Sequence, residues 1–211
     1  MVSNRLSWIF MEIPALAVFS YFFFTGSAQK NGYSLFLGAL WIIHYLHRSL
    51  VFPFLIRTKK KKMPLLISFM SVFFNLVNGY INGYYLGTIF PDGKDYYYLD
   101  PLFIFGGLLF LAGILINIQS DQILINLRKN GSESYSIPYG GLFRFISCPN
   151  YFGEILEWFG YAVMAWSLPA FSFFIWTFAN LVPRALHYQK WYKGHFIDYP
   201  GSRKAIVPFI L

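Results

Sequence analysis

The sequence of residues 147–166 is SCPNYFGEILEWFGYAVMAW, an apolar segment that contains two glutamates. Five of its residues fall on or near one face of a helix: Asn150, Glu154, Glu157, Trp158 and Tyr161. A charge at membrane depth costs at least ~2.5–3.5 kcal/mol on insertion scales, so such glutamates normally face a partner or a wet cavity. The alternative is a helix end at the membrane interface with both carboxylates in water. Because amide, carboxylate and aromatic side chains share one face, we favour the wall of a polar site.

Composition indicates a polytopic membrane protein with a single domain spanning residues 1–211. The chain of 211 residues is 56% hydrophobic and only 12% charged, against about 25% charged residues in soluble domains. The net charge of +8 does not indicate a nucleic-acid partner, because much of it lies in the basic run at residues 57–62. Such a run is typical of the cytoplasmic side of a membrane, and only secondarily of contact with anionic lipids. The single cysteine, Cys148, excludes an intrachain disulfide and a cysteine-based metal cluster.

Hydropathy predicts an all-α bundle of six membrane-spanning helices. Each stretch is close to the length of about 20 apolar residues that a membrane crossing needs. The predicted spans are residues 6–25, 34–56, 64–90, 101–127, 150–167 and 169–191. The first is a retained helix and not a signal peptide, since Glu12 and Pro14 interrupt it. The last two are joined at residues 167–169, which is too short for anything but a helical hairpin.

The distribution of Lys and Arg predicts the orientation of these spans. Residues 57–62, the loop at 128–148 and the C-terminal tail are basic, whereas residues 91–100 are acidic. With six spans and both termini cytoplasmic, every basic segment lies on one side. The sequence has no internal repeat, which disfavours a transporter built from duplicated halves. His44 and His47 do not predict a metal site, because the chain has four histidines and no histidine cluster.

Polar residues at the end of the fourth span form a second stripe. Asn117, Asp121 and Arg128 lie at positions i, i+4 and i+11. They are either an Asp–Arg pair that closes the helix or hydrogen-bond partners for a large polar ligand. In the following loop, Gly140 and Gly141 allow the backbone to approach a ligand. The sequence lacks the Gly-x-Gly-x-x-Gly motif, so a Rossmann nucleotide site is not predicted.

Two residues near the N-terminus are candidate hydrogen-bond donors. Glu12 is the only ionisable group within the first apolar stretch, and desolvation favours the neutral acid, which can donate a proton or a hydrogen bond. The alternative is an interfacial glutamate that reaches water. Tyr45 carries a phenol that, in a dry pocket, can donate a strong hydrogen bond to a carbonyl oxygen.

The last span ends in a basic and aromatic face. Residues at i, i+3 and i+4 spacing contribute Arg184, His187, Tyr188, Trp191 and Tyr192. This face is either an interfacial belt or part of a ligand site.

Taken together, these segments resemble the steroid 5α-reductase family of polytopic, NADPH-dependent reductases. The matching segments cover nearly the whole chain in order: residues 12–14, 44–49, 82–85, 117–121, 127–129, 137–138, 140–143, 147–166, 196–200, 202–205 and 208–209. The C-terminal half alone is also similar to sterol reductases and isoprenylcysteine methyltransferases. Glu12 and the segment at 44–48 favour the 5α-reductase branch.

The resemblance implies reduction of the Δ4 double bond of a 3-oxosteroid, with hydride delivered to C5. Glu12 and Tyr45 would hydrogen-bond the C3 carbonyl oxygen and stabilise the enolate that forms there. Eight positions would hold NADPH: Asn117, Asp121, Arg128, Tyr135, Asn150, Glu154, His187 and Tyr192. Arg128 and Arg184 would contact its phosphates. Trp8, Trp158 and Leu181 would line the substrate pocket.

This sequence departs from the family pattern at three points. Family members usually begin with a further span, giving seven helices, so we expect a shorter, bacterial-type member or a trimmed copy. Met11 stands where Gln often precedes the glutamate, and Tyr188 where His is common.

Three other functions remain open from the sequence. They are reduction of another enone or enoyl lipid such as a sterol or fatty acyl chain, an isoprenylcysteine-methyltransferase-like activity that uses S-adenosylmethionine, and a small-solute channel. We expect a multi-pass protein of a bacterial inner membrane or the endoplasmic reticulum, with the cofactor side cytoplasmic. The expected partners are a steroid or related lipid and membrane lipids, with no nucleic acid, no metal and no obligate protein partner, as in a monomer.

Overall fold

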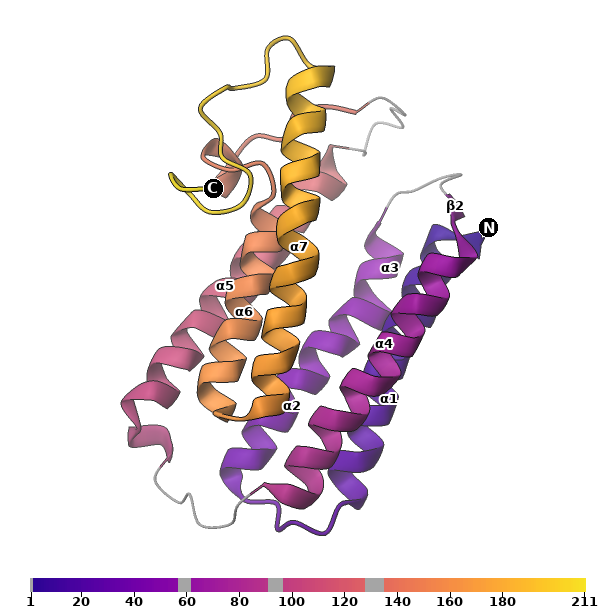
Figure 1. Ribbon diagram of the computed structural model, residues 1–211, viewed down its shortest axis with the longest axis vertical. Coiled ribbons are helices and arrows are strands. Elements are labelled where there is room, and N and C mark those ends of the chain that lie inside the picture. The colour runs from indigo at the N-terminus through magenta and orange to yellow at the C-terminus, as the bar shows by residue number, and fades with distance from the viewer. Residues whose placement is uncertain (1, 57–61, 91–96, 128–134) are drawn as a thin grey trace. The chain divides into compact units, whose positions relative to one another are not determined.

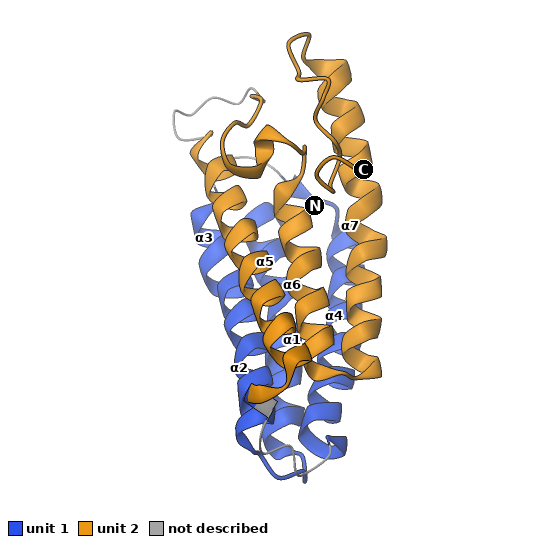
Figure 2. Cartoon of the chain, turned by 90° about the vertical axis from the view of Figure 1, so that its left-hand side faces the viewer, with its two compact units in different colours: residues 1–98 blue, residues 99–211 orange. Residues whose placement is uncertain are grey.

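The computed structural model describes residues 2–56, 62–90, 97–127 and 135–211. The described chain is mainly helical, with irregular connections and two short strands, β1 (Val2–Ser3) and β2 (Lys62–Met63), which pair antiparallel. Its contacts divide it into two compact units, Met1–Tyr98 and Leu99–Leu211 (Figure 2). The predicted all-α class is confirmed.

The first unit contains the helices α1 (Asn4–Thr25), α2 (Gly32–Leu46), α3 (Phe52–Leu55) and α4 (Leu65–Tyr84) (Figure 1). The Ser3 and Asn31 side chains cap α1 and α2 by accepting backbone hydrogen bonds from Leu6 and Ser34. A π-helical segment, His47–Val51, connects α2 to α3. The predicted second span is therefore one continuous helical segment, Gly32–Leu55, that changes from α-helix to π-helix and back. Pro53, which cannot donate a backbone hydrogen bond, follows this widened turn.

Glycines bring α4 close to α1. A Cβ atom on Gly83 would lie 2.6 Å from the backbone oxygen of Phe19, and one on Gly79 would lie 3.1 Å from that of Ala15. Membrane helices pack closely where small residues line the contact. After Tyr84 the helix continues as a second π-helical segment, Tyr85–Ile89.

The second unit contains α5 (Pro101–Asn126), α6 (Pro149–Ala165) and α7 (Leu168–His195). A 3-10 turn, Gly141–Arg144, precedes α6. Trp166 adopts the left-handed conformation after α6, and Ser167 caps α7 by accepting a hydrogen bond from the Ala170 backbone. The predicted hairpin at residues 167–169 is confirmed.

The chain is a membrane protein. Four helical segments among the described residues are long and apolar enough to cross a membrane: Asn4–Thr25, Gly32–Leu55, Leu65–Ile89 and Pro101–Asn126. These correspond to the first four predicted spans. Helix α6 has 17 residues and α7 has 28, and the assignment of both as membrane crossings stays a prediction.

Candidate active site

Glu12 and Tyr45 lie beside the same face of α4 in the first unit. Glu12 is half-buried on α1, and Tyr45 on α2 is only 3% exposed. The Nδ2 group of Asn75 lies 3.4 Å from Oε2 of Glu12, and Nδ2 of Asn78 lies 3.5 Å from the Tyr45 hydroxyl. Because these two asparagines are three residues apart on one helix, they bring the two predicted catalytic side chains to neighbouring positions.

The buried asparagines of α4 are functional candidates that the sequence reasoning missed. Asn75, Asn78 and Asn82 are each less than 10% exposed. Their spacing of three and four residues within the third predicted span was the available signal, since polar side chains in membrane helices usually have a partner or a function.

Trp8 lies one turn before Glu12 on α1, in an aromatic and cationic environment. The Trp8 ring meets the Phe52 ring edge-on at 5.1 Å, and the guanidinium of Arg48 lies 5.0 Å from the Trp8 ring centre. Arg48 lies a similar distance, 4.8 Å, from the Phe52 ring. These contacts hold Trp8 on the side of α1 from which Glu12 also projects.

A polar chain links α5 to α6 in the second unit. Asn117 donates from Nδ2 to the backbone oxygen of Asn150 at 2.9 Å, and Asn150 donates from Nδ2 to Asp121 Oδ1 at 3.3 Å. Asn117 and Asp121 are 4% and 7% exposed. Three predicted cofactor residues are thus brought together. Amide and carboxylate groups of this kind can hydrogen-bond the hydroxyl and amide groups of a polar ligand.

Glycines explain why the polar chain can form. A Cβ atom on Gly153 would lie 2.6 Å from the Asn117 backbone nitrogen and 2.7 Å from the Gly113 oxygen. The glycine within residues 147–166 therefore allows α6 to approach α5 where Asn117 reaches Asn150. Glu154 is half-buried one turn after Asn150, and Glu157 is fully buried.

The predicted residues of α7 are more exposed. Arg184 and His187 are exposed, and Tyr192 is half-buried. Tyr135 is exposed, and its ring meets Trp191 at 4.9 Å. Arg128 lies outside the described residues.

Trp158 and Leu181, the predicted substrate-lining residues of the second unit, are both buried. Trp158 is 1% exposed and Leu181 is 8% exposed. The Trp158 ring packs against Phe173 of α7 with 4.4 Å between centroids. Trp8, the third predicted substrate-lining residue, belongs to the first unit.

The segment after α7 turns back and binds the loop before α6 (Figure 1). The backbone nitrogens of Ser147 and Cys148 donate to the oxygens of Lys204 and Ala205 at 2.8 and 3.1 Å. Arg203 is 2% exposed and donates from its guanidinium to the Pro138 oxygen at 3.0 Å. These contacts were not predictable from local sequence patterns, because each joins segments far apart in the chain. They hold the start of α6, where Asn150 lies.

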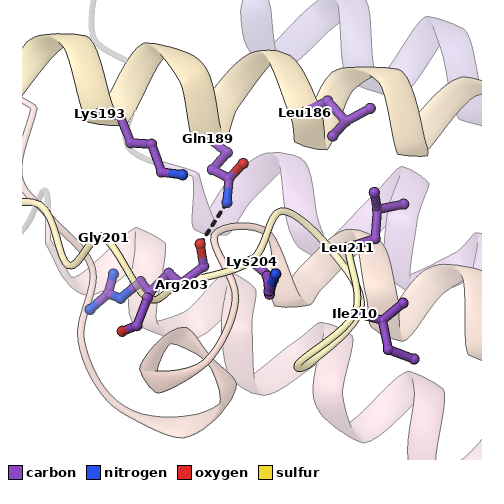
Figure 3. A pocket seen from close by; sticks show the side chains of 9 residues that line it. Leu186, Gln189, Lys193, Gly201, Arg203, Lys204, Ile210 and Leu211 are labelled. Atoms are coloured by element: carbon purple, nitrogen blue, oxygen red, sulfur yellow. Dashed lines mark hydrogen bonds between the residues drawn. The ribbon is translucent and has the colours of Figure 1, made fainter.

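A pocket of about 420 Å³ lies between α7 and this C-terminal segment (Figure 3). Leu186, Gln189 and Lys193 line it from α7, and Gln189 donates to the Arg203 backbone oxygen at 2.6 Å. At 3.6 residues per turn, Leu186 and Lys193 project from the side of α7 opposite to Arg184. None of the predicted site residues that the structure describes lines this pocket.

Comparison with known proteins identifies the family. A sequence profile described as 3-oxo-5-alpha-steroid 4-dehydrogenase matches residues 61–211. The chain is 43% identical over 211 residues to the human protein named 3-oxo-5-alpha-steroid 4-dehydrogenase 1, covering 99% of this chain and 81% of that protein. It is 40% identical over 213 residues to steroid 5-alpha-reductase DET2 of Gossypium hirsutum, covering 99% of this chain and 83% of that protein. The DET2 protein of Arabidopsis thaliana is 40% identical over 215 residues, with 99% and 82% covered. The chain therefore belongs to the 3-oxo-5-alpha-steroid 4-dehydrogenase family of oxidoreductases.

Proposed function

We propose that this chain is a membrane reductase that uses NADPH to convert 3-oxo-Δ4 steroids to 5α-dihydrosteroids. The observation that carries the proposal is the placement of Glu12 and Tyr45 beside one buried face of α4, within 3.4 and 3.5 Å of Asn75 and Asn78. A carboxylic acid and a phenol at neighbouring positions form a pair of donors for one carbonyl oxygen. The family match covers nearly the whole chain, which supports the same reaction.

Glu12 and Tyr45 would act on the C3 carbonyl oxygen. Reduction at C5 moves negative charge onto this oxygen, and donors already in position stabilise that charge. A proton added at C4 completes the reaction, so one substrate molecule takes up one hydride and one proton. Removing one such donor typically lowers the rate by ~10²–10³.

The polar chain of the second unit would hold the cofactor, which supplies the hydride when bound. Asn117, Asp121, Asn150 and Glu154 offer amide and carboxylate partners for its ribose and carboxamide groups. Arg184 and Arg128 suit its phosphates, because a guanidinium makes planar paired hydrogen bonds with phosphate oxygens. Tyr135, His187 and Tyr192 complete the proposed cofactor set.

The substrate would bind among apolar and aromatic side chains, with Trp8, Trp158 and Leu181 lining the steroid. Aromatic rings give a large apolar surface with defined geometry. Because the substrate is a lipid, it would reach the protein from the membrane.

We further propose six membrane spans within one domain of residues 1–211. Helices α6 and α7 would provide the last two spans, with both termini and the cofactor side cytoplasmic. This arrangement leaves every basic loop on one side. We also propose that the protein works as a monomer in a bacterial inner membrane or the endoplasmic reticulum.

Turnover by the purified full chain tests this proposal. NADPH oxidation should depend on testosterone or progesterone and should yield the 5α-dihydrosteroid. Glu12→Leu and Tyr45→Phe should each lower kcat by roughly 100-fold or more, since each removes a donor. Tyr84→Phe is the matched control, because Tyr84 is 38% exposed on α4.

Two results would contradict the proposal. One is absence of steroid turnover together with binding of S-adenosylmethionine. The other is full activity in both donor variants. Oxidation of NADPH with another enone lipid but with neither steroid would support the reductase architecture and overturn the substrate assignment.

A further inference from the structure

Three buried asparagines on α4 donate hydrogen bonds in two groups: Asn82 donates to Asn78, which lies beside Tyr45, and Asn75 donates separately to Met11 and Glu12. Asn75, Asn78 and Asn82 are 6%, 5% and 4% exposed. Burying an amide without hydrogen-bond partners is unfavourable, so a helix retains such residues only where they have partners or a function. The partners here include both predicted catalytic residues.

Asn82 fixes the orientation of Asn78. Its Nδ2 group donates to Oδ1 of Asn78 at 3.0 Å and to the Asn78 backbone oxygen at 3.1 Å. Because the side-chain oxygen of Asn78 faces Asn82, its NH₂ group faces Tyr45. An amide NH₂ can only donate, so the Tyr45 oxygen is the acceptor in this contact. The phenol proton must then point to a different acceptor.

Asn75 acts in the same way on Glu12. Its Nδ2 group donates to the Met11 backbone oxygen at 2.5 Å and to Oε2 of Glu12 at 3.4 Å. In the neutral acid that the proposed function requires, this donation suits Oε2 as the carbonyl acceptor and Oε1 as the hydroxyl that donates. The contact to Met11 also fixes the turn of α1 on which Glu12 stands.

We infer that Asn75 and Asn78, with Asn82 behind them, are positioning residues that set the direction in which Glu12 and Tyr45 donate. This inference rests on the proposed function. Hydrogen bonds that run in one direction polarise one another, so the relay from Asn82 through Asn78 strengthens Tyr45 as a donor. The close packing at Gly79 and Gly83 brings α4 near enough to α1 for Asn75 to reach Met11 and Glu12.

A merely structural role is the competing explanation, because asparagines also join membrane helices by hydrogen bonds. The two explanations differ in what they predict for the substrate carbonyl. If the role is structural, the variants should lower the affinity for every steroid ligand equally. A positioning role affects only ligands that carry the C3 oxygen.

The test uses the purified full chain with a matched pair of steroids, testosterone and its 3-deoxy analogue. Wild type should turn over testosterone and bind it more tightly than the analogue. Asn78→Leu and Asn75→Leu should lower kcat by roughly 10–100-fold, since misplaced reacting groups cost rates of this order. Both variants should also lose the preference for the 3-oxo compound while binding the 3-deoxy analogue with unchanged Kd.

Asn180→Leu is the matched control. Asn180 of α7 also donates from Nδ2 to a backbone oxygen one turn earlier, that of Trp176 at 2.9 Å. This variant should retain both kcat and the preference for the 3-oxo compound.

Asn82→Leu is a second test variant, for the case in which Asn78→Leu does not fold. It removes both hydrogen bonds from Asn82 to Asn78 but keeps the Asn78 side chain, and it should also lower kcat.

The outcomes separate this inference from the proposed function. If wild type neither turns over testosterone nor distinguishes the two steroids, the proposed function fails. If wild type does both, and folded Asn78→Leu or Asn82→Leu retains wild-type kcat and preference, the positioning role is overturned. An equal loss of affinity for both steroids in the variants would also overturn it, in favour of a structural role.

Discussion

Tyr192 of α7 stacks on Tyr199 of the C-terminal segment, with ring centroids 5.2 Å apart and ring planes 9° from parallel. The Tyr199 hydroxyl in turn lies 2.7 Å from Oγ of Ser147, just before α6. The C-terminal segment therefore connects one proposed cofactor residue, Tyr192, to the start of the helix that carries another, Asn150. The second unit organises its polar residues through this segment as well as through its helices.

Replacing Tyr199 should weaken cofactor binding from a distance. Tyr199→Leu removes both the stacked ring and the hydroxyl, so KM for NADPH should rise by roughly tenfold, as expected when a positioning contact is lost. Tyr199→Phe keeps the ring and should have the smaller effect. Steady-state kinetics with varied NADPH measure both. Equal effects of the two variants would show that the stacked ring does not hold Tyr192.

Removing Asp121 should weaken cofactor binding directly. Asp121→Leu removes the acceptor that lies 3.3 Å from Nδ2 of Asn150. A hydrogen bond to a charged group contributes about 1.5–3 kcal/mol, so the Kd for NADPH should rise by about tenfold or more. Isothermal titration calorimetry provides the measurement. Gln122→Leu is the control, because Gln122 is exposed and its Nε2 donates to the neighbouring Asn126 side chain. An equal loss of NADPH affinity in Gln122→Leu would contradict the assignment.

Two adjacent glycines on α5 should differ in their tolerance of a methyl group. A Cβ atom on Gly106 would lie 2.7 Å from the Gly160 oxygen, whereas one on Gly107 would meet only the Met164 sulfur, at 3.7 Å. Gly106→Ala should therefore lower the free energy of unfolding by about 1–3 kcal/mol through overpacking. Gly107→Ala should leave it nearly unchanged. Unfolding in detergent measures both variants, and equal stability would contradict the close approach of α5 and α6.

Cys148 should be chemically inert in the folded protein. The thiol is 5% exposed, and burial raises its pKa to about 12. Because the thiolate is the reactive form and a raised pKa keeps the thiol protonated, maleimide labelling should be negligible from pH 7 to 9. Labelling should become complete in denaturant. Ile197→Cys places a thiol at a fully exposed position and should label rapidly; rapid labelling of folded wild type would contradict the burial of Cys148.

Hydropathy predicted the helices because the length and apolar character of a membrane crossing are local properties. When the π-helical segments are joined to the helices they continue, each long helical segment begins and ends within about four residues of a predicted span. The change of pitch at residues 47–51 was not predicted, because it depends on backbone geometry rather than on apolar periodicity. The described helices match the predicted spans because an apolar segment in a membrane must hydrogen-bond its own backbone N–H and C=O groups, and a helix does this.

The candidate site was only partly predictable. Spacing placed Asn117, Asp121 and Asn150 on helix faces, and the structure joins them by hydrogen bonds. The roles of Asn75 and Asn78 required knowledge of which helix packs against α4. Arg203 in the C-terminal segment reads as one more basic residue in a basic tail, although it is 2% exposed. Such contacts depend on tertiary structure, which spacing along one helix cannot supply.

The most direct test of the central claim uses NADPH that carries deuterium at C4 of the nicotinamide. The proposed reaction predicts transfer of deuterium to C5 of testosterone, giving 5α-dihydrotestosterone with one deuterium at that carbon. The same label should be transferred far more slowly by Tyr45→Phe, since the C3 oxygen has then lost a donor. Mass spectrometry and NMR of the product locate the label. Deuterium at another carbon, or a product in which the Δ4 bond is intact, would contradict the proposed reaction.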